Sequence, residues 1–257
     1  MFIQKYQVKI AVSLSVISIV ALALAAQASH SWGGYHWART ANPFTLKVGD
    51  NVSSMWDSYL TTASSDWSLS SVLDTVVVPG NTNPKNCRST AGRVEVCNNK
   101  YGNNGWLGIA SIWISGTHIT QGVVKMNDTY FSTSKYNTSA WKNLVMCQEV
   151  GHTFGLDHQD EDFYNTPLGT CMDYTSDPTL NQHPDRHDYD MLETIYAHLD
   201  STTSVAQSVS SPKPEIDHSD KKELGKELRR SQDGRVSLHM RDFGHGEKVF
   251  TFVFWDN

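Results

Sequence analysis

The sequence predicts an α+β domain built on a twisted mixed sheet, and two kinds of apolar periodicity lead to this prediction. Several short apolar runs bounded by Pro, Gly and Asn are typical of strands. Between them lie segments whose apolar residues recur every three or four positions, as on one face of a helix. Of the 257 residues 39% are hydrophobic and 19% charged, which suits one sizeable core and excludes a disordered polyelectrolyte. The formal net charge of −6 argues against a nucleic-acid partner.

The first 28 residues have the form of a secretory signal. Lys5 and Lys9 precede an apolar run over 10–26, which ends in the small-residue triplet Ala26-Gln27-Ala28. A run of about 17 residues lies at the lower limit of what spans a bilayer, so a retained anchor is the weaker interpretation. We expect cleavage of 1–28 and a secreted, extracellular chain without a membrane partner.

Residues 29–200 carry the predicted elements of the main domain. A strand over 44–48 comes first, and a helix follows because apolar residues from Val52 to Trp67 are spaced three and four apart, with Asp50 or Asn51 as its N-cap. Four further strands are expected at 75–78, 93–96, 106–114 and 118–126. Two more helices are expected at 139–154 and 188–199. This mixture favours a twisted sheet with helices packed on it.

The composition changes after residue 200. Residues 201–220 are rich in Ser, Thr and Pro and are interpreted as a linker. In the segment 221–257, two strand-like runs at 236–243 and 248–255 predict a small β-hairpin appendage. A segment of about 37 residues can hardly hold its own core, so we expect it to dock on the main domain or to bind another molecule.

The chain has four cysteines, and an even number in an exported protein favours two disulfides. Because Cys87 and Cys97 flank a short polar segment, a local bridge between them is the simplest pairing, and Cys147 would then pair with Cys171. Alternatively, Cys147 is a metal ligand. On a helix, however, Cys147 lies about 140° from His152 around the axis, which favours the disulfide.

One segment combines residues that suit a metal site. Gln148 and His152 are four residues apart, so on a helix both side chains project from one face. Glu149 sits about 100° further round the helix and can reach a metal-bound water. Gly155 can take a left-handed conformation and end the helix, so that His158 approaches the same ion from another side. The spacing predicts Gln148, His152 and His158 as ligands of one metal ion.

This pattern resembles the metzincin superfamily of zinc metalloendopeptidases, whose signature is His-Glu-x-x-His-x-x-Gly-x-x-His followed by a methionine turn. Here Gln148 stands in place of the first His, and Cys171-Met172-Asp173-Tyr174 stands where the methionine turn is expected. The resemblance covers most of residues 35–200. The motif is most similar to that of matrixins, whereas Tyr174 is more like astacins and serralysins. The resemblance implies an active-site helix with Met172 beneath the metal. The expected Cys147–Cys171 disulfide would then join this helix to the methionine turn.

The function that this resemblance implies is a secreted zinc-dependent endopeptidase, a hydrolase of peptide bonds. Zinc lowers the pKa of its bound water and polarises the scissile carbonyl. Glu149 then accepts the water proton as general base and delivers it to the leaving amine. Tyr174 is expected to hydrogen-bond the developing oxyanion. A polypeptide substrate is expected to lie as an added extended strand along the strand at 106–114.

Gln148 leaves two rival interpretations open. Zinc prefers imidazole nitrogen or thiolate to an amide oxygen, so one rival is a zinc-poor pseudopeptidase that binds polypeptides without cutting them. The other is an exported zinc hydrolase that acts on non-peptide amides.

Two further groups carry weaker signals. Asp160-Glu161-Asp162 has side chains that suit Ca²⁺, although such an acidic run more often forms a solvated loop. The histidines at 118, 183, 187, 198, 239 and 245 show no spacing that builds a second ion site, and we expect surface or packing roles for most of them.

Overall fold

The computed structural model describes residues 30–208 and 214–256 of the chain. The predicted secretory signal at 1–28 and part of the predicted linker lie outside these residues. Over the ranges that the structure describes, no helix has the length and apolar character needed to cross a membrane.

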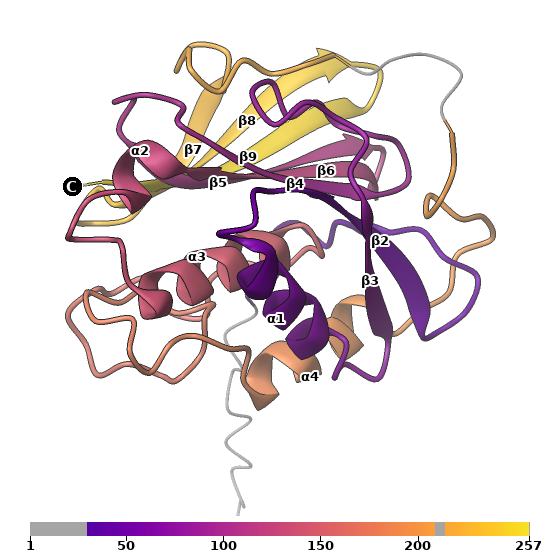
Figure 1. Ribbon diagram of the computed structural model, residues 1–257. Coiled ribbons are helices and arrows are strands. Elements are labelled where there is room, and N and C mark those ends of the chain that lie inside the picture. The colour runs from indigo at the N-terminus through magenta and orange to yellow at the C-terminus, as the bar shows by residue number, and fades with distance from the viewer. Residues whose placement is uncertain (1–29, 209–213, 257) are drawn as a thin grey trace, which may run out of the picture.

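A mixed sheet forms the centre of the molecule. Its strands follow the order β3-β2-β4-β6-β5-β9-β8-β7, and β1 pairs with β6 (Figure 1). The pairs β1–β6, β2–β3, β2–β4 and β4–β6 are parallel, whereas β5 runs antiparallel to both of its neighbours, β6 and β9. The first six strands are His36–Trp37, Phe44–Asn51, Leu73–Pro79, Val94–Asn99, Trp106–Ser115 and His118–Asn127. The predicted α+β class with a mixed sheet is confirmed.

Helices lie on one face of this sheet. In Figure 1, α1 (Asp57–Trp67) and α3 (Ser139–His152) lie below the strands, and α4 (Arg186–Ile195) follows on the same side. The short helix α2 (Asp128–Phe131) directly follows β6. Side chains of β5 alternate between the two faces: Ala110 and Ile112 join the main core on the helix side, and Ile109 and Trp113 join a smaller core on the opposite side.

Helix α1 begins later than the apolar spacing predicts. Residues 53–56 form a turn, in which the Trp56 amide donates to the Ser53 carbonyl at 2.7 Å. Trp56 is the N-cap residue of the helix and makes no side-chain cap bond, so the prediction of Asp50 or Asn51 as cap is wrong. The spacing misleads because Trp56 is buried for another reason: its indole nitrogen donates to Asp128 Oδ1 at 2.9 Å.

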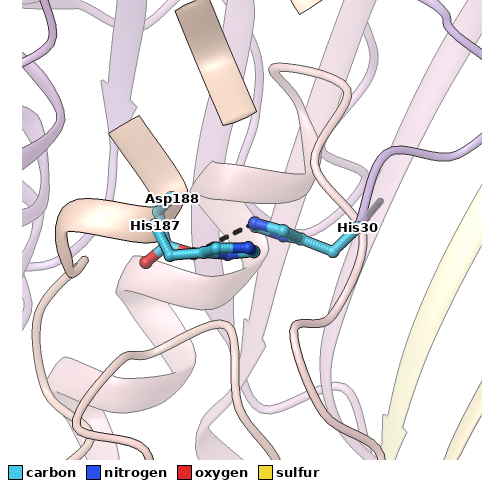
Figure 2. Close-up of side chains that lie close together, drawn as sticks. All are labelled: His30, His187 and Asp188. Carbon is cyan, nitrogen blue, oxygen red and sulfur yellow. Dashed lines mark ion pairs between the residues drawn. The ribbon is translucent and has the colours of Figure 1, made fainter. Parts of the chain in front are cut away.

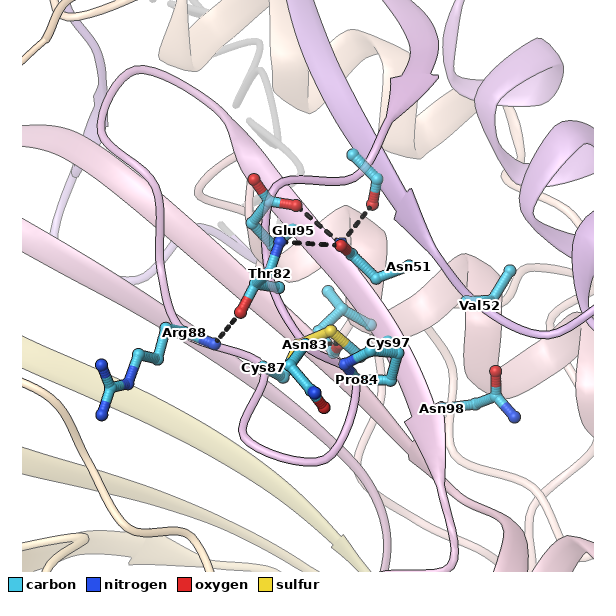
Figure 3. Close-up of a disulfide and its surroundings, with 12 residues drawn as sticks. Asn51, Val52, Thr82, Asn83, Pro84, Cys87, Arg88, Glu95, Cys97 and Asn98 are labelled. Carbon is cyan, nitrogen blue, oxygen red and sulfur yellow. Dashed lines mark hydrogen bonds between the residues drawn. A yellow bond between two sulfur atoms is a disulfide. The ribbon is translucent and has the colours of Figure 1, made fainter.

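Both expected disulfides are present, and they link Cys87 to Cys97 and Cys147 to Cys171. The first closes the loop before β4. Figure 3 shows polar contacts beside it, where Asn51 donates to Glu95 and accepts a hydrogen bond from the Thr82 amide. All four cysteines are therefore used, and the alternative of Cys147 as a metal ligand is ruled out in this structure.

The C-terminal residues extend the main sheet instead of forming a separate body. The predicted hairpin is present as β8 (Val236–Gly244) and β9 (Glu247–Trp255), and the charged strand β7 (Lys226–Arg230) pairs with β8. Strand β9 pairs with β5 from Trp106 to Ser115. The edge of β5 along which we expect a substrate strand is therefore already occupied by the chain's own β9.

Candidate metal centre

Helix α3 places Gln148, Glu149 and His152 deep inside the molecule, because every residue from Leu144 to its end at His152 is buried. Two contacts fix the helix from neighbouring elements. The disulfide from Cys147 ties it to the predicted methionine turn, and the indole nitrogen of Trp67 in α1 donates to the Cys147 carbonyl at 3.1 Å.

Met172 packs directly against α3 at Gly151. A Cβ on Gly151 would lie 2.8 Å from the Met172 sulfur and 2.6 Å from the Trp67 ring, so this position requires a glycine. The close approach brings the segment of Met172 against the helix, one residue before His152.

Gly155 turns the chain back toward the site, as the sequence predicts. Its φ is +98°, in the left-handed region, and a Cβ here would lie 2.3 Å from the Tyr35 carbonyl oxygen. After this turn the chain places His158 against His152.

The two histidines face each other through the same ring atom. Their Nε2 atoms lie 3.0 Å apart, and the rings are nearly perpendicular at 76°. His152 Nδ1 lies 2.9 Å from the Leu156 carbonyl oxygen, which can only accept, so Nδ1 carries the proton and the neutral ring directs the Nε2 lone pair at His158. Burial lowers the pKa of His152 well below its usual value and that of His158 to about 4. Both rings are thus neutral near pH 7, the form that binds a metal.

Glu149 lies three residues before His152 on α3, in an apolar setting. Its side chain is buried, and Oε2 has no hydrogen-bond partner among the described residues. A Cβ on Gly108 of β5 would lie 2.8 Å from Glu149 Oε1, so the carboxyl group reaches the backbone of β5. Burial raises the pKa of this carboxyl well above its usual value.

Gln148 is buried, and its amide nitrogen donates to the Cys171 carbonyl at 2.9 Å. A carbonyl only accepts, so the end of the amide facing Cys171 is the nitrogen, and the oxygen is the end left for a ligand role. Gln148 is thus tied to the segment that carries Met172.

Tyr174 contacts the third predicted ligand. Its hydroxyl lies 2.9 Å from His158 Nδ1, across the ring from the Nε2 atom that faces His152. Burial raises the pKa of Tyr174 well above its usual value, so the phenol stays protonated. In this arrangement Tyr174 positions His158.

Two charged residues that the sequence patterns do not indicate also act on His158. Asp157 Oδ1 lies 3.5 Å from His158 Nδ1, and Arg229 of β7 pairs with both Asp157 and Glu161. Although burial opposes it, hydrogen bonds with His158 and Arg229 hold the pKa of Asp157 well below its usual range. The C-terminal strands thus supply a charge beside the histidine pair.

The C-terminal hairpin also covers the histidines directly. The ring of Phe252 in β9 stacks on the His152 ring with centroids 3.9 Å apart and planes at 6°. It also meets the His158 ring edge-on at 5.5 Å. With Phe252 in place, Glu149 and His152 are each only 1% exposed, and the site is closed.

The first described residue anchors the loop that carries His158. His30 Nδ1 lies 3.0 Å from the Asp157 carbonyl oxygen, and the Asp157 amide donates to the His30 carbonyl. Figure 2 shows the same imidazole stacked on His187 and paired with Asp188, with 3.7 Å between His30 Nε2 and Asp188 Oδ1. Burial raises the pKa of Asp188 to about 7.

The acidic run beyond His158 is used mainly within its own loop. Asp160 Oδ1 accepts the Asp162 amide at 2.6 Å, and Asp162 Oδ1 accepts the Tyr164 amide at 2.9 Å. Among the described residues, the acid of this run that joins a cluster of three metal-type ligands is Glu161, together with Asp157 and His158. Arg229 already pairs with that cluster.

Two imidazole nitrogens therefore face each other, and α3 carries the buried carboxyl group of Glu149 and the buried amide of Gln148 within one turn of His152. This set suits a divalent cation with a proton acceptor next to it. Searches against models of known protein families and against curated proteins find no match for this chain.

Proposed function

We propose that this protein is a latent zinc-dependent endopeptidase of the metzincin type, closed by its own C-terminal hairpin. The observation that carries the proposal is the pair of facing Nε2 atoms of His152 and His158, 3.0 Å apart, at the end of a helix that also carries the buried carboxyl of Glu149. His158 Nδ1 accepts from the Tyr174 hydroxyl, so without a cation His158 Nε2–H donates to the lone pair of His152 Nε2, and a bound cation would replace that one proton.

The residues fit zinc. Ligand atoms about 2.0–2.1 Å from a tetrahedral zinc ion lie roughly 3.3 Å from one another, close to the separation of the two Nε2 atoms. His152 is held in the required tautomer by its bond to the Leu156 carbonyl. The amide oxygen of Gln148 supplies the third protein ligand. When bound, zinc would acidify water and polarise the scissile carbonyl.

Glu149 is the general base. Its carboxylate takes the proton from the attacking water and passes it to the leaving amine, and its apolar surroundings tune its pKa upward, toward the working range of such a group. Tyr174 acts through His158, whose ring it holds at Nδ1. Asp157 and Arg229 support the same ring.

The pairing of β9 with β5 supports a polypeptide as substrate. Strand β5 accepts an antiparallel strand over Trp106–Ser115, directly beside Glu149. A peptide that replaced β9 would find the same backbone donors and acceptors. Since Phe252 covers His152, cleavage requires β9 to leave first.

The test compares zinc content and casein cleavage of the full-length exported protein with those of Glu149→Ala. We expect stoichiometric zinc in both proteins and chelator-sensitive cleavage by the unsubstituted protein alone, enhanced when the hairpin is released by limited proteolysis. A purified protein that takes up no zinc at His152 and His158 would refute the proposal.

One observation favours a second candidate, a polypeptide-binding module without catalysis. The amide nitrogen of Gln148 donates to the Cys171 carbonyl, and β9 already occupies the strand position beside β5. This candidate predicts that a released cleft binds extended peptides whether or not zinc is present, and that the bound peptides stay intact. The non-peptide amidohydrolase makes the opposite prediction for small amide substrates, which it would hydrolyse.

A further inference from the structure

A second cluster of histidines surrounds the carboxylate of Asp200. The Nε2 atoms of His36, His118 and His198 lie 3.4, 3.2 and 3.7 Å from the same oxygen, Asp200 Oδ1. In addition, His36 Nε2 and His198 Nε2 are 3.2 Å apart. The ligand atoms of His36, His198 and Asp200 all lie within 4.8 Å of one another.

Neighbouring groups hold this arrangement in place. His36 Nδ1 lies 2.9 Å from the Gly34 carbonyl oxygen, which fixes the ring with Nε2 directed at Asp200. The other carboxylate oxygen, Asp200 Oδ2, accepts hydrogen bonds from the Arg39 guanidinium at 2.9 Å and the Arg39 amide at 3.1 Å. Asp200 Oδ1 is thereby left for the histidines.

The ring of His36 can offer Nε2 to a cation. A carbonyl oxygen only accepts, so His36 Nδ1 carries a proton, and in the neutral ring Nε2 then has a lone pair. His198 Nε2 and Asp200 Oδ1 lie 3.2 and 3.4 Å from this atom, and the side chains of His36 and Asp200 are only 7% and 10% exposed. Three donor atoms thus converge in a largely buried place, where one cation can contact all of them.

We propose that His36, His198 and Asp200 bind a second zinc ion. Donor atoms of a tetrahedral zinc site lie roughly 3.3 Å apart, and the ring planes of His36 and His198 cross at 88°, so that both can point at one ion. Bound hydrogen-bond partners on Nδ1 of a histidine and on the second oxygen of a carboxylate are the usual support for such ligands.

This ion has a structural role. It ties together His36 and His198, which lie 162 positions apart in the sequence. It joins β1 to the residues after α4, two segments that also meet through Arg39 and Asp200. The N-terminal segment contacts the Asp157 loop through His30, and the ion would hold the same segment at His36. The inference is independent of the proposed peptidase activity, since none of its residues belongs to the α3 site.

The test counts zinc ions per chain by native mass spectrometry of the full-length protein, for the unsubstituted chain and for His198→Ala. The side chain of His198 is 55% exposed, so its removal leaves the fold intact. We expect His198→Ala to lose one zinc equivalent per chain, and zinc to raise the melting temperature of the unsubstituted protein more than that of the variant.

His183→Ala is the matched control, because His183 is 57% exposed and pairs with an aspartate outside the cluster. It should keep the full zinc content. The proposal is overturned if His198→Ala and the unsubstituted protein bind equal amounts of zinc. Because the comparison measures a difference, its outcome holds whether or not His152 and His158 bind an ion of their own.

Discussion

The ring of Phe252 stacks on the ring of His152, with centroids 3.9 Å apart and planes inclined by only 6°. The contact joins the last strand of the chain to the last turn of α3. It places an apolar ring where a metal-bound histidine would meet a substrate, and the accompanying β9–β5 pairing fills the strand position beside Glu149. Restraint of the proposed activity therefore lies at the C-terminal end of the chain.

Removing this ring should expose the histidine pair. We expect Phe252→Ala to cost about 3–5 kcal/mol of stability, as for other buried phenylalanines. We also expect a faster reaction of His152 with diethyl pyrocarbonate, measured by peptide mass spectrometry, and more rapid zinc uptake.

Phe250→Ala is the control for this change. Phe250 lies two residues earlier on β9 and packs in the same core, on Trp32 and Tyr35 instead of His152. It should lose similar stability with a smaller gain in His152 reactivity. Equal reactivity in the two variants would mean that loosening of the hairpin, and not the Phe252 ring, controls access.

Much of this fold follows from local sequence patterns, and the closure of the site does not. Helix α3 and strands β5 and β6 agree with the expected ranges. Their apolar residues, which predict these elements, are also the residues that the fold buries. Strand β7 was not expected, since its residues are charged and exposed and it is held by pairing with β8. Arg229 reaches Asp157 only through that strand.

The histidine clusters show the same limit. Gln148, His152 and His158 are visible as a set because one helix and one glycine turn connect them. By contrast, His36 and His198 meet through tertiary packing across 162 positions, and no local spacing reveals such a contact. Phe252 likewise has no sequence feature that ties it to His152.

Glu149→Gln should separate catalysis from metal binding. The amide keeps the size of the buried side chain but cannot accept a proton, so peptide cleavage should fall by about 100-fold or more, in line with the loss of a general base. Zinc content should stay unchanged because Glu149 is not a ligand. If the variant loses zinc as well, Glu149 is a ligand of the ion and not the general base.

Gln148→His should tighten zinc binding. Imidazole nitrogen is a better zinc ligand than an amide oxygen, and we expect the dissociation constant to fall by about tenfold or more. Competition with a chromophoric chelator measures this change. Gln159→His makes the same chemical substitution in the loop after His158 and serves as the control, with little effect expected. An unchanged affinity in Gln148→His would show that position 148 does not contact the ion.

The two disulfides should differ in what their removal does. Replacing Cys147 and Cys171 with Ala opens a longer loop than replacing Cys87 and Cys97, with sequence separations of 24 and 10. The chain-entropy estimate is about 3.5 kcal/mol for the first and about 3 kcal/mol for the second. Chemical denaturation measures both. Only the Cys147–Cys171 bridge links α3 to the Met172 segment, so we expect only its removal to weaken zinc binding. A similar loss of zinc affinity after removal of the Cys87–Cys97 bridge would contradict this assignment.

Acid should loosen the segment that carries His218. Burial, assisted by the nearby Lys125 charge, lowers the pKa of His218 well below its usual value of 6.5. The unfolded segment therefore binds a proton more readily than the folded one, so the stabilisation is complete above pH 6.5 and is lost progressively as the pH falls below it. His218 Nε2 lies 2.8 Å from Ser111 Oγ, which in turn contacts Thr251 of β9, so the loss reaches the closing strand.

Hydrogen exchange of residues 214–224 and of β9 should accelerate between pH 7.5 and pH 5. His218→Gln keeps a partner for Ser111 but does not titrate, and its exchange, corrected for the intrinsic pH effect, should stay constant over the same range. Equal acceleration in both proteins would assign the acid response to other groups.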